Sequence, residues 1–405
     1  MKKLIILLLI FCGLQAADIK GSLTTGVFTG TPFWNSDNYR NTDRYKNSAY
    51  YDADKVIEKD ATFWRTTNRL RLQGKFGQHF SFYMQALRSD DFSGENHLSD
   101  TKIYQAYGKY CFAKGSVKAG RFLPFQRWIV GSVDGAVLAW RITPKITVSA
   151  LGGMHVPYGL IYDSDKQMAL GYADVAVRFK PVRFKIKAYG DEEVVKSGID
   201  FYTRLGKVNI SGNYGFDFSN SQIADGGLAA FWAVDNKLAL NVNYRLFRTL
   251  PGKWGDIQFN SYLIERFLGG LRYQIWNGLY LDAQQMISMT SERKDYLSLL
   301  NVSSKYFNFG VNYLSGDSGL KRMGLLLGAQ YTLFDQLRLA AGASPVDYLP
   351  ANETDHLLTI AYYFRAGYRF LDHFSAALNF NYYQDNPALE SKFRGGIQLR
   401  YNFGS

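Results

Sequence analysis

The sequence predicts an all-β fold, a transmembrane up-and-down antiparallel β-barrel, from three observations. Apolar and polar residues alternate along most of the chain, which is the period of a strand with two different faces. The alternating segments are about 9 to 14 residues long, which suits a tilted strand that crosses a bilayer. Tight turns and longer polar links alternate between them, as expected for short periplasmic turns and longer extracellular loops.

Composition favours strands over membrane helices. The chain has 405 residues and is rich in Tyr (29), Phe (29) and Gly (38). Its mean hydropathy of -0.20 is too polar for a bundle of transmembrane helices.

The first residues have the features of an export signal. Lys2 and Lys3 precede a short apolar run, residues 4–11, and small residues follow it. A membrane-spanning helix would need about 20 apolar residues, so an N-terminal anchor is the weaker interpretation. We therefore expect residues 1–16 to be a signal peptide and residues 17–405 to form the barrel.

The alternation is clearest in "FWRTTNRLRLQGKF" (residues 63–76) and "LTIAYYFRAGYRF" (residues 358–370). Each has apolar and aromatic side chains on one face and Arg, Thr or Gln on the other. Tight turns are predicted near Gly77-Gln78, Lys114-Gly115, Pro144-Lys145, Pro181-Val182, Gly206-Lys207, Asp235-Asn236, Asn277-Gly278, Tyr306, Phe334-Asp335 and Asp372-His373. These turns and two chain ends on the same side predict about 22 strands, with about 16 to 20 as the alternative because three segments are short.

A soluble β-sandwich or propeller is the competing class. Its core faces would be mostly aliphatic and dry. Here the polar face carries Arg, Lys, Asn and Gln in most segments, and burying so many unpaired charges would cost several kcal/mol each. The polar face is therefore expected to line a water-filled lumen.

The export signal, the alternation and the terminal "QLRYNF" resemble those of Gram-negative outer-membrane porins. The resemblance implies an outer-membrane location and contact with outer-membrane lipid and lipopolysaccharide. It also implies that Tyr401 and Phe403 form the signal read by the barrel-assembly machinery, although Gly404 and Ser405 follow here. It leaves open whether the protein is a homotrimer.

A second stretch, residues 118–153, is similar to part of the porin-like and alginate-export-like barrels. The matching pieces are Gly120-Arg121 and Asp134-Gly135. Because one loop joins the two segments, we expect an Arg121–Asp134 ion pair in the lumen near a constriction. The alternative is two unrelated charges at the rim.

The distribution of charge suggests what the lumen passes. The formal net charge is +12, and the charges are scattered singly rather than clustered as in a nucleic-acid-binding tail. The predicted polar face has more cations than acids, the acids being Asp174, Asp200, Asp217 and Asp282. The cations expected to line the pore and attract anions are Arg65, Arg69, Arg71, Arg121, Arg183, Lys185, Lys187, Arg365, Arg369 and Arg400.

We therefore predict a porin that lets small polar, preferentially anionic solutes diffuse. An exporter of an acidic polysaccharide would also need a basic lumen and is the main alternative. Arg65 and Arg394 could instead bind lipopolysaccharide phosphates at the rim. The long link, residues 32–60, is expected to be a mobile extracellular loop, the alternatives being an inward constriction or an external sugar-binding surface.

An outer-membrane lipid hydrolase is the least favoured alternative. The chain has no Gly-x-Ser-x-Gly elbow, no His-Glu-x-x-His motif and no Cys/His spacing for a metal. Most of its histidines fall at predicted turns or loops. We expect no enzymatic activity, no cofactor and no metal.

Overall fold

The computed structural model describes residues 17–30, 63–92, 98–124, 128–129, 131–156, 168–248, 252–254, 257–259, 263–291, 293–317, 321–349, 356–384 and 392–404. The predicted signal peptide (residues 1–16), the link at 32–60 and Ser405 lie outside this part of the chain. Within it, no helix has the length and apolar character needed to cross a membrane.

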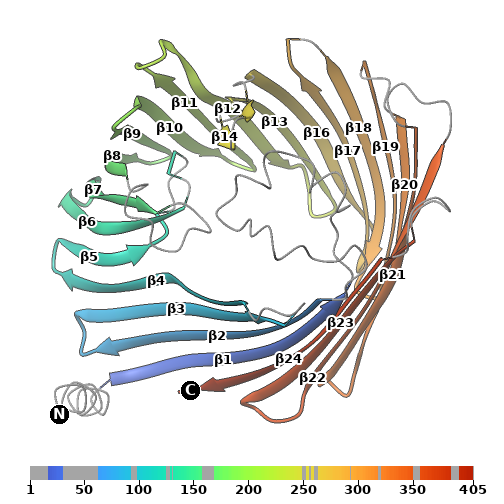
Figure 1. Cartoon of the computed structure of the whole chain (residues 1–405). Helices are drawn as coiled ribbons and strands as arrows, with labels where there is room; N and C mark the ends of the chain where they lie inside the picture. Colours follow the sequence, from blue (N-terminus) through green and yellow to red (C-terminus); the bar gives the residue numbers. More distant parts are fainter. Residues whose placement is uncertain are drawn as a thin grey trace, which may run out of the picture.

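The described chain forms one 22-stranded antiparallel sheet and one small two-stranded sheet (Figure 1). The small sheet pairs β14 (Gly252–Trp254) with β15 (Ile257–Phe259). The strands of the large sheet are β1 (Ala17–Gly30), β2 (Phe63–Phe76), β3 (Phe80–Asp91), β4 (Leu98–Phe112), β5 (Gly115–Phe122), β6 (Ser132–Thr143), β7 (Ile146–Val156), β8 (Met168–Phe179), β9 (Val182–Asp191), β10 (Val195–Leu205), β11 (Val208–Asp217), β12 (Gln222–Ala233), β13 (Leu238–Arg248), β16 (Leu263–Trp276), β17 (Leu279–Met289), β18 (Lys294–Ser304), β19 (Phe307–Gly316), β20 (Lys321–Leu333), β21 (Leu337–Leu349), β22 (Leu357–Arg369), β23 (Phe374–Gln384) and β24 (Lys392–Phe403).

The large sheet closes on itself. Each of its strands pairs with its neighbours in sequence order, and β1 also pairs with β24, so Val27 lies opposite Ile397 and Leu23 opposite Tyr401. The predicted closed barrel of 22 strands is therefore confirmed. Closure removes the free edges of the first and last strands, in keeping with the requirement that backbone groups in a bilayer be paired.

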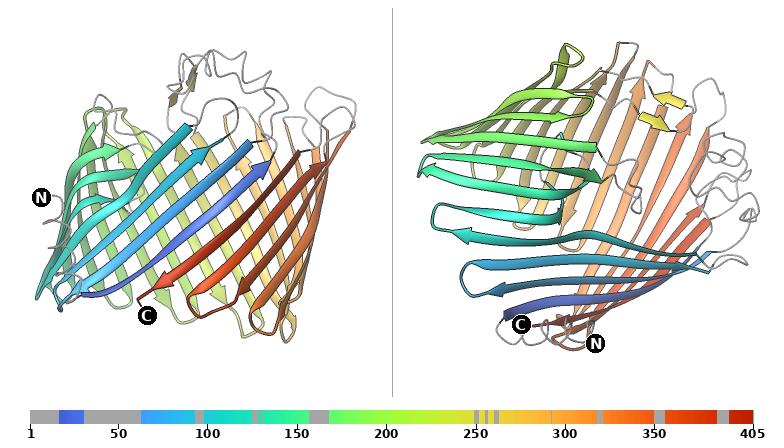
Figure 2. Two further views of the ribbon diagram at one scale, coloured as in Figure 1. Left: turned by 60° about the horizontal axis from the view of Figure 1, so that its bottom comes forward. Right: turned by 60° about the vertical axis from the view of Figure 1, so that its left-hand side comes forward.

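The predicted tight turns all fall at one end of the barrel, which we call the turn end, together with the start of β1 and the end of β24 (Figure 2). The opposite, loop end differs from the prediction in part. Four of its connections are short, at residues 192–194, 218–221, 290–293 and 317–320. A short polar link can occur at either end, so link length alone did not show which end a turn belongs to.

Gly404 has a structural reason to be glycine. Its φ of 71° lies in the left-handed region, and a Cβ there would overlap the carbonyl oxygen of Ile19 on the neighbouring strand. Because the chain passes this close to β1 after Phe403, only a residue without a side chain fits at position 404.

The two faces of the sheet differ as the alternation predicts. Large apolar side chains at every second position are exposed on one face, for example Leu23 (43%), Ile186 (60%) and Leu399 (54%). Directly opposed residues on neighbouring strands lie on the same face, so the odd or even positions that carry the exposed apolar residues, which we call the outer parity, can be followed around the barrel. The face of outer parity is the lipid-facing surface, and the other face lines the lumen.

If the two faces are assigned correctly, an introduced arginine should destabilise the barrel more on the outer face than on the lumenal face. Ile186→Arg, on the outer face near the middle of β9, should lower the free energy of unfolding by about 2–4 kcal/mol because it places a cation in hydrocarbon. Ser211→Arg, on the lumenal face of β11, is the matched control and should cost less than about 1 kcal/mol because water solvates it. Urea unfolding in liposomes measures both, and equal losses would refute the assignment.

Candidate functional site in the barrel lumen

Most of the cations predicted to line the pore lie on the lumenal face. They occupy positions of the opposite parity to the exposed apolar residues, and their cross-strand partners are lumenal as well. These residues are Arg65, Arg69, Arg71, Arg183, Lys185, Lys187, Arg365, Arg369 and Arg400.

Several of these cations fall in one cross-strand row. Following directly opposed residues from β22 to β4, the register runs through Arg369, Ser375, Arg400, Thr24, Arg69, Leu87 and Lys102. A cation thus recurs on every second strand, roughly 10 Å apart at about 4.8 Å per strand. We call Arg369, Arg400, Arg69 and Lys102 the basic row.

The arginines of the basic row are available to the lumen. Arg69, Arg369 and Arg400 are all exposed, and none has an ion pair with a described residue. Arg400 Nε donates to Asn402 Oδ1 at 2.9 Å, which fixes the side chain without neutralising it. These three arginines therefore present uncompensated positive charge to the water column.

The two lumenal lysines of β9 are different, because each has an acidic partner. Lys187 Nζ lies 2.7 Å from Asp200 Oδ1, and its side chain is only 5% exposed. Lys185 Nζ is 4.0 Å from Asp174 Oδ2. These two lysines contribute less to an anion-attracting field than the basic row does.

The connection between β5 and β6 folds into the lumen, and we call its described residues 123–124, 128–129 and 131 the inward segment. Trp128 Nε1 donates to Asp225 Oδ1 on β12 at 2.9 Å, and Asn213 Nδ2 donates to the other oxygen of this carboxylate at 2.8 Å. Lys187 Nζ lies 4.4 Å from the centroid of the Trp128 ring, a cation–π contact. One aromatic ring thus anchors the segment to β9 and β12.

Two glycines make room for this ring. A Cβ on Gly215 would lie 2.7 Å from Trp128 Cζ2, and one on Gly198 would lie 2.9 Å from Trp128 Cη2. Both glycines are lumenal and directly opposed across β10 and β11. Their missing side chains form the flat surface on which Trp128 rests.

The inward segment also covers an apolar cluster on the lumenal wall. Phe122 and Val133 are fully buried, and Ile129 is 6% exposed. They pack with Leu151, Leu170, Tyr172 and Tyr189. Burying each large apolar side chain contributes about 1.5–3 kcal/mol, so the segment is held by packing as well as by Trp128. It therefore narrows the lumen from one side.

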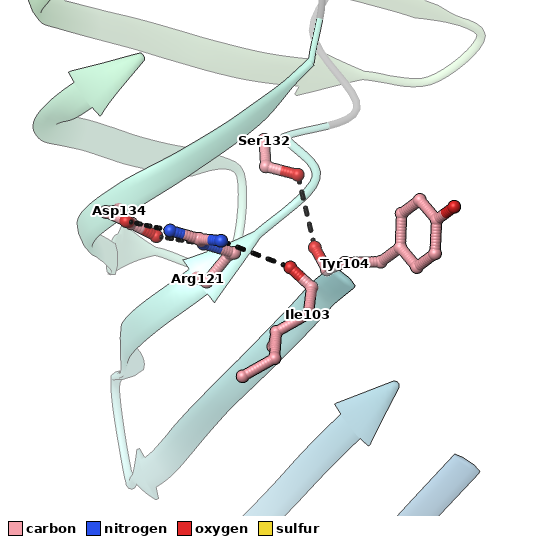
Figure 3. Close-up of polar contacts among 5 residues, drawn as sticks. All are labelled: Ile103, Tyr104, Arg121, Ser132 and Asp134. Atoms are coloured by element: carbon pink, nitrogen blue, oxygen red, sulfur yellow. Dashed lines mark hydrogen bonds and ion pairs between the residues drawn. The ribbon is translucent and has the colours of Figure 1, made fainter. Parts of the chain in front are cut away.

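The predicted Arg121–Asp134 ion pair exists, but its predicted lumenal position is wrong. Arg121 Nε and Nη2 lie 2.7 and 2.6 Å from the two oxygens of Asp134, and Nη1 donates to the Ile103 carbonyl at 3.2 Å (Figure 3). Arg121 has the parity of exposed Val117, whereas its neighbour Phe122 is lumenal. The pair thus lies on the outer face near the loop end, where it ties the short strand β5 to β4 and β6.

The sequence analysis missed the inward segment. Its signal was present, because the link after Arg121 reads "FLPFQRWIV" and is far more apolar than the other connections at the loop end. An apolar link cannot remain in water at low cost and has to find a surface to cover. The sequence analysis gave an inward constriction as an alternative for the link at 32–60, and that link lies outside the described residues.

Two histidines of the described chain, His79 and His356, make ordinary hydrogen-bond contacts. His79 Nδ1 lies 2.9 Å from the Cys111 carbonyl oxygen, and His356 Nδ1 lies 3.1 Å from Asp347. Among the described residues, no group of three His, Cys, Asp or Glu side chains is placed to hold a metal ion.

Comparison with known proteins identifies relatives by fold only. No family model matches the chain, and no curated protein matches it. The translocation pore of the P pilus usher PapC matches with a TM-score of 0.50 and 9% identity, over 95% of this chain and 99% of that chain. OccK5 of Pseudomonas aeruginosa, also named OpdH, matches with a TM-score of 0.45 and 11% identity, over 95% of this chain and 98% of that chain. OccAB3 of Acinetobacter baumannii matches with a TM-score of 0.45 and 12% identity, over 95% of this chain and 99% of that chain.

The fold defines the class of protein. A closed, antiparallel, 22-stranded barrel with an apolar outer face and a charged lumenal face is an outer-membrane β-barrel of the Gram-negative porin type. Its location is the outer membrane.

Releasing Trp128 should widen the lumen. Trp128→Ala removes the hydrogen bond to Asp225 and the ring that lies against Gly198 and Gly215. We expect a larger single-channel conductance in planar bilayers. Gly215→Ala should act in the same direction, because its Cβ pushes against the ring.

The matched control is Trp140→Ala, which removes the same side chain from the outer face, where it is 46% exposed. Its conductance should equal that of the unaltered protein. If Trp128→Ala also leaves conductance unchanged, the inward segment is not the narrow point of the lumen.

Proposed function

We propose that the protein is an outer-membrane channel through which small polar solutes diffuse, with a preference for anions. The basic row carries this proposal, because its exposed arginines follow one another along the lumenal face and have no acidic partners among the described residues. A low-dielectric wall focuses their field into the water column and raises the local concentration of anions.

The spacing of the basic row supports passage rather than tight binding. Cations roughly 10 Å apart offer an anion a series of similar sites, so it can move from one to the next. A single deep site would hold the anion and slow its exit. The row also climbs around the barrel, because Arg369 lies near the turn end of β22 and Lys102 near the loop end of β4.

The inward segment favours small solutes over a polymer. Packing and one hydrogen-bonded ring hold it against the wall, so it takes up space in the lumen. An exporter of an acidic polysaccharide would need this space cleared for each chain. Deletion of the gene separates the two functions, since a channel supports growth on small anions and an exporter supports polysaccharide secretion.

Liposome swelling tests the channel directly. Proteoliposomes are diluted into isosmotic solutions of an anionic sugar acid, a neutral sugar or an amino sugar of similar size. The anionic solute should enter fastest and the cationic solute slowest. Equal rates for all three would leave a non-selective channel, and fastest entry of the amino sugar would overturn the proposal.

Reversing charge in the basic row should reverse the preference. Arg69→Glu with Arg400→Glu should lower the ratio of anionic to neutral solute flux about tenfold, because two sites of the row then repel anions. Lys114→Glu with Lys237→Glu makes the same change of net charge in two turns and should alter the ratio less than about twofold. Equal effects of the two double variants would show that overall charge, and not the row, sets selectivity.

A further inference from the structure

Three neighbouring turns border an open cationic cavity at the turn end of the barrel. It has a volume of about 990 Å³ and lies where β7, β8, β9 and β10 meet their turns. Five of its lining residues are cations, and none is acidic: Lys145, Arg178, Lys180, Arg183 and Arg204. The ring of Tyr202 completes the wall.

The cations are placed in direct opposition. Arg178 and Arg183 are cross-strand partners on the lumenal face, and Arg183 is opposed by Tyr202 on its other side. The Lys145 carbonyl accepts a hydrogen bond from the backbone N–H of Arg178 at 2.9 Å, so a third cation lies beside them. Like charges opposed in this way destabilise a sheet unless a counter-charge lies between them.

No acid of the described chain neutralises this group. The carboxylates on the same wall are already engaged, Asp174 with Lys185 and Asp200 with Lys187. Arg204 Nε donates to the Gly206 carbonyl at 3.3 Å, and the Arg183 guanidinium lies 5.8 Å from the Tyr202 ring centroid. These contacts orient two arginines but leave their positive charge uncompensated.

We propose that this cavity binds a phosphate group, carried either by a small solute or by a lipid headgroup. Several guanidinium groups around one space suit an anion with three or more oxygens, because each offers paired N–H donors. The cavity is larger than one phosphate, and Tyr202 and Phe179 provide apolar surface for the group that carries it. The site deepens the proposed function and rests on it for its role, which is to hold a phosphorylated anion at the turn-end mouth.

Calorimetry on the full-length protein in neutral detergent tests the site without any measurement of flux. Inorganic phosphate and short-chain phosphatidic acid are titrated separately. The altered protein is Arg178→Gln with Arg183→Gln. The matched control, Lys237→Gln with Lys305→Gln, removes two positive charges from other turns of the same end. Heat-modifiable migration on gels confirms that each variant is folded.

We expect binding of phosphate or phosphatidic acid to weaken at least tenfold in the Arg178/Arg183 variant and to be retained in the Lys237/Lys305 variant. Binding of inorganic phosphate identifies a solute site, and binding of phosphatidic acid alone identifies a lipid headgroup site. No binding of either probe, or equal loss in both variants, overturns the proposal. Because transport is not measured, a failure here is distinct from a failure of anion selectivity.

Discussion

The pairing of β1 with β24 is the constraint on which the rest of the structure depends. In a bilayer, an unpaired strand edge leaves N–H and C=O groups without partners, so the sheet has to close. Closure also fixes the register, since Thr24 faces both Arg69 and Arg400. A slip of one residue would turn every apolar side chain of a strand into the lumen and every charged one into lipid.

This register makes the lumen asymmetric. The basic row runs along one wall, from β22 through β1 to β4, and its three arginines are exposed. The inward segment contacts the wall formed by β9 to β12, where Lys187 is paired with Asp200. Figure 1 shows β10 to β12 across the barrel from β1 to β3. The two walls of the lumen therefore differ, since one carries exposed arginines and the other is partly covered by the inward segment.

The strands and their number could be predicted because each strand carries its own signal. Alternation identifies a two-faced strand locally. Glycines such as Gly206 and Gly278 mark the turns, because both have a positive φ that glycine adopts more readily than other residues. The same alternation was enough to place Arg121 outside, since it shares the parity of Val117.

The parts that could not be predicted depend on contacts between distant segments. The basic row requires the register of consecutive strand pairs from β22 to β4, and one bulge such as that at Gln85/Ala86 changes the row. The position of Trp128 depends on Gly198, Gly215 and Asp225, which lie together on one wall of the lumen. Each of these residues looks ordinary in its own strand, and their shared role exists only in the closed barrel.

The central claim is that the lumen is basic enough to select for anions. The most direct measurement is the reversal potential of the purified protein in a planar bilayer with a KCl gradient. The account predicts a reversal potential with the sign of chloride permeating faster than potassium, and a magnitude that falls as ionic strength rises because salt screens the basic row. A reversal potential of the opposite sign, showing preference for potassium, would contradict it.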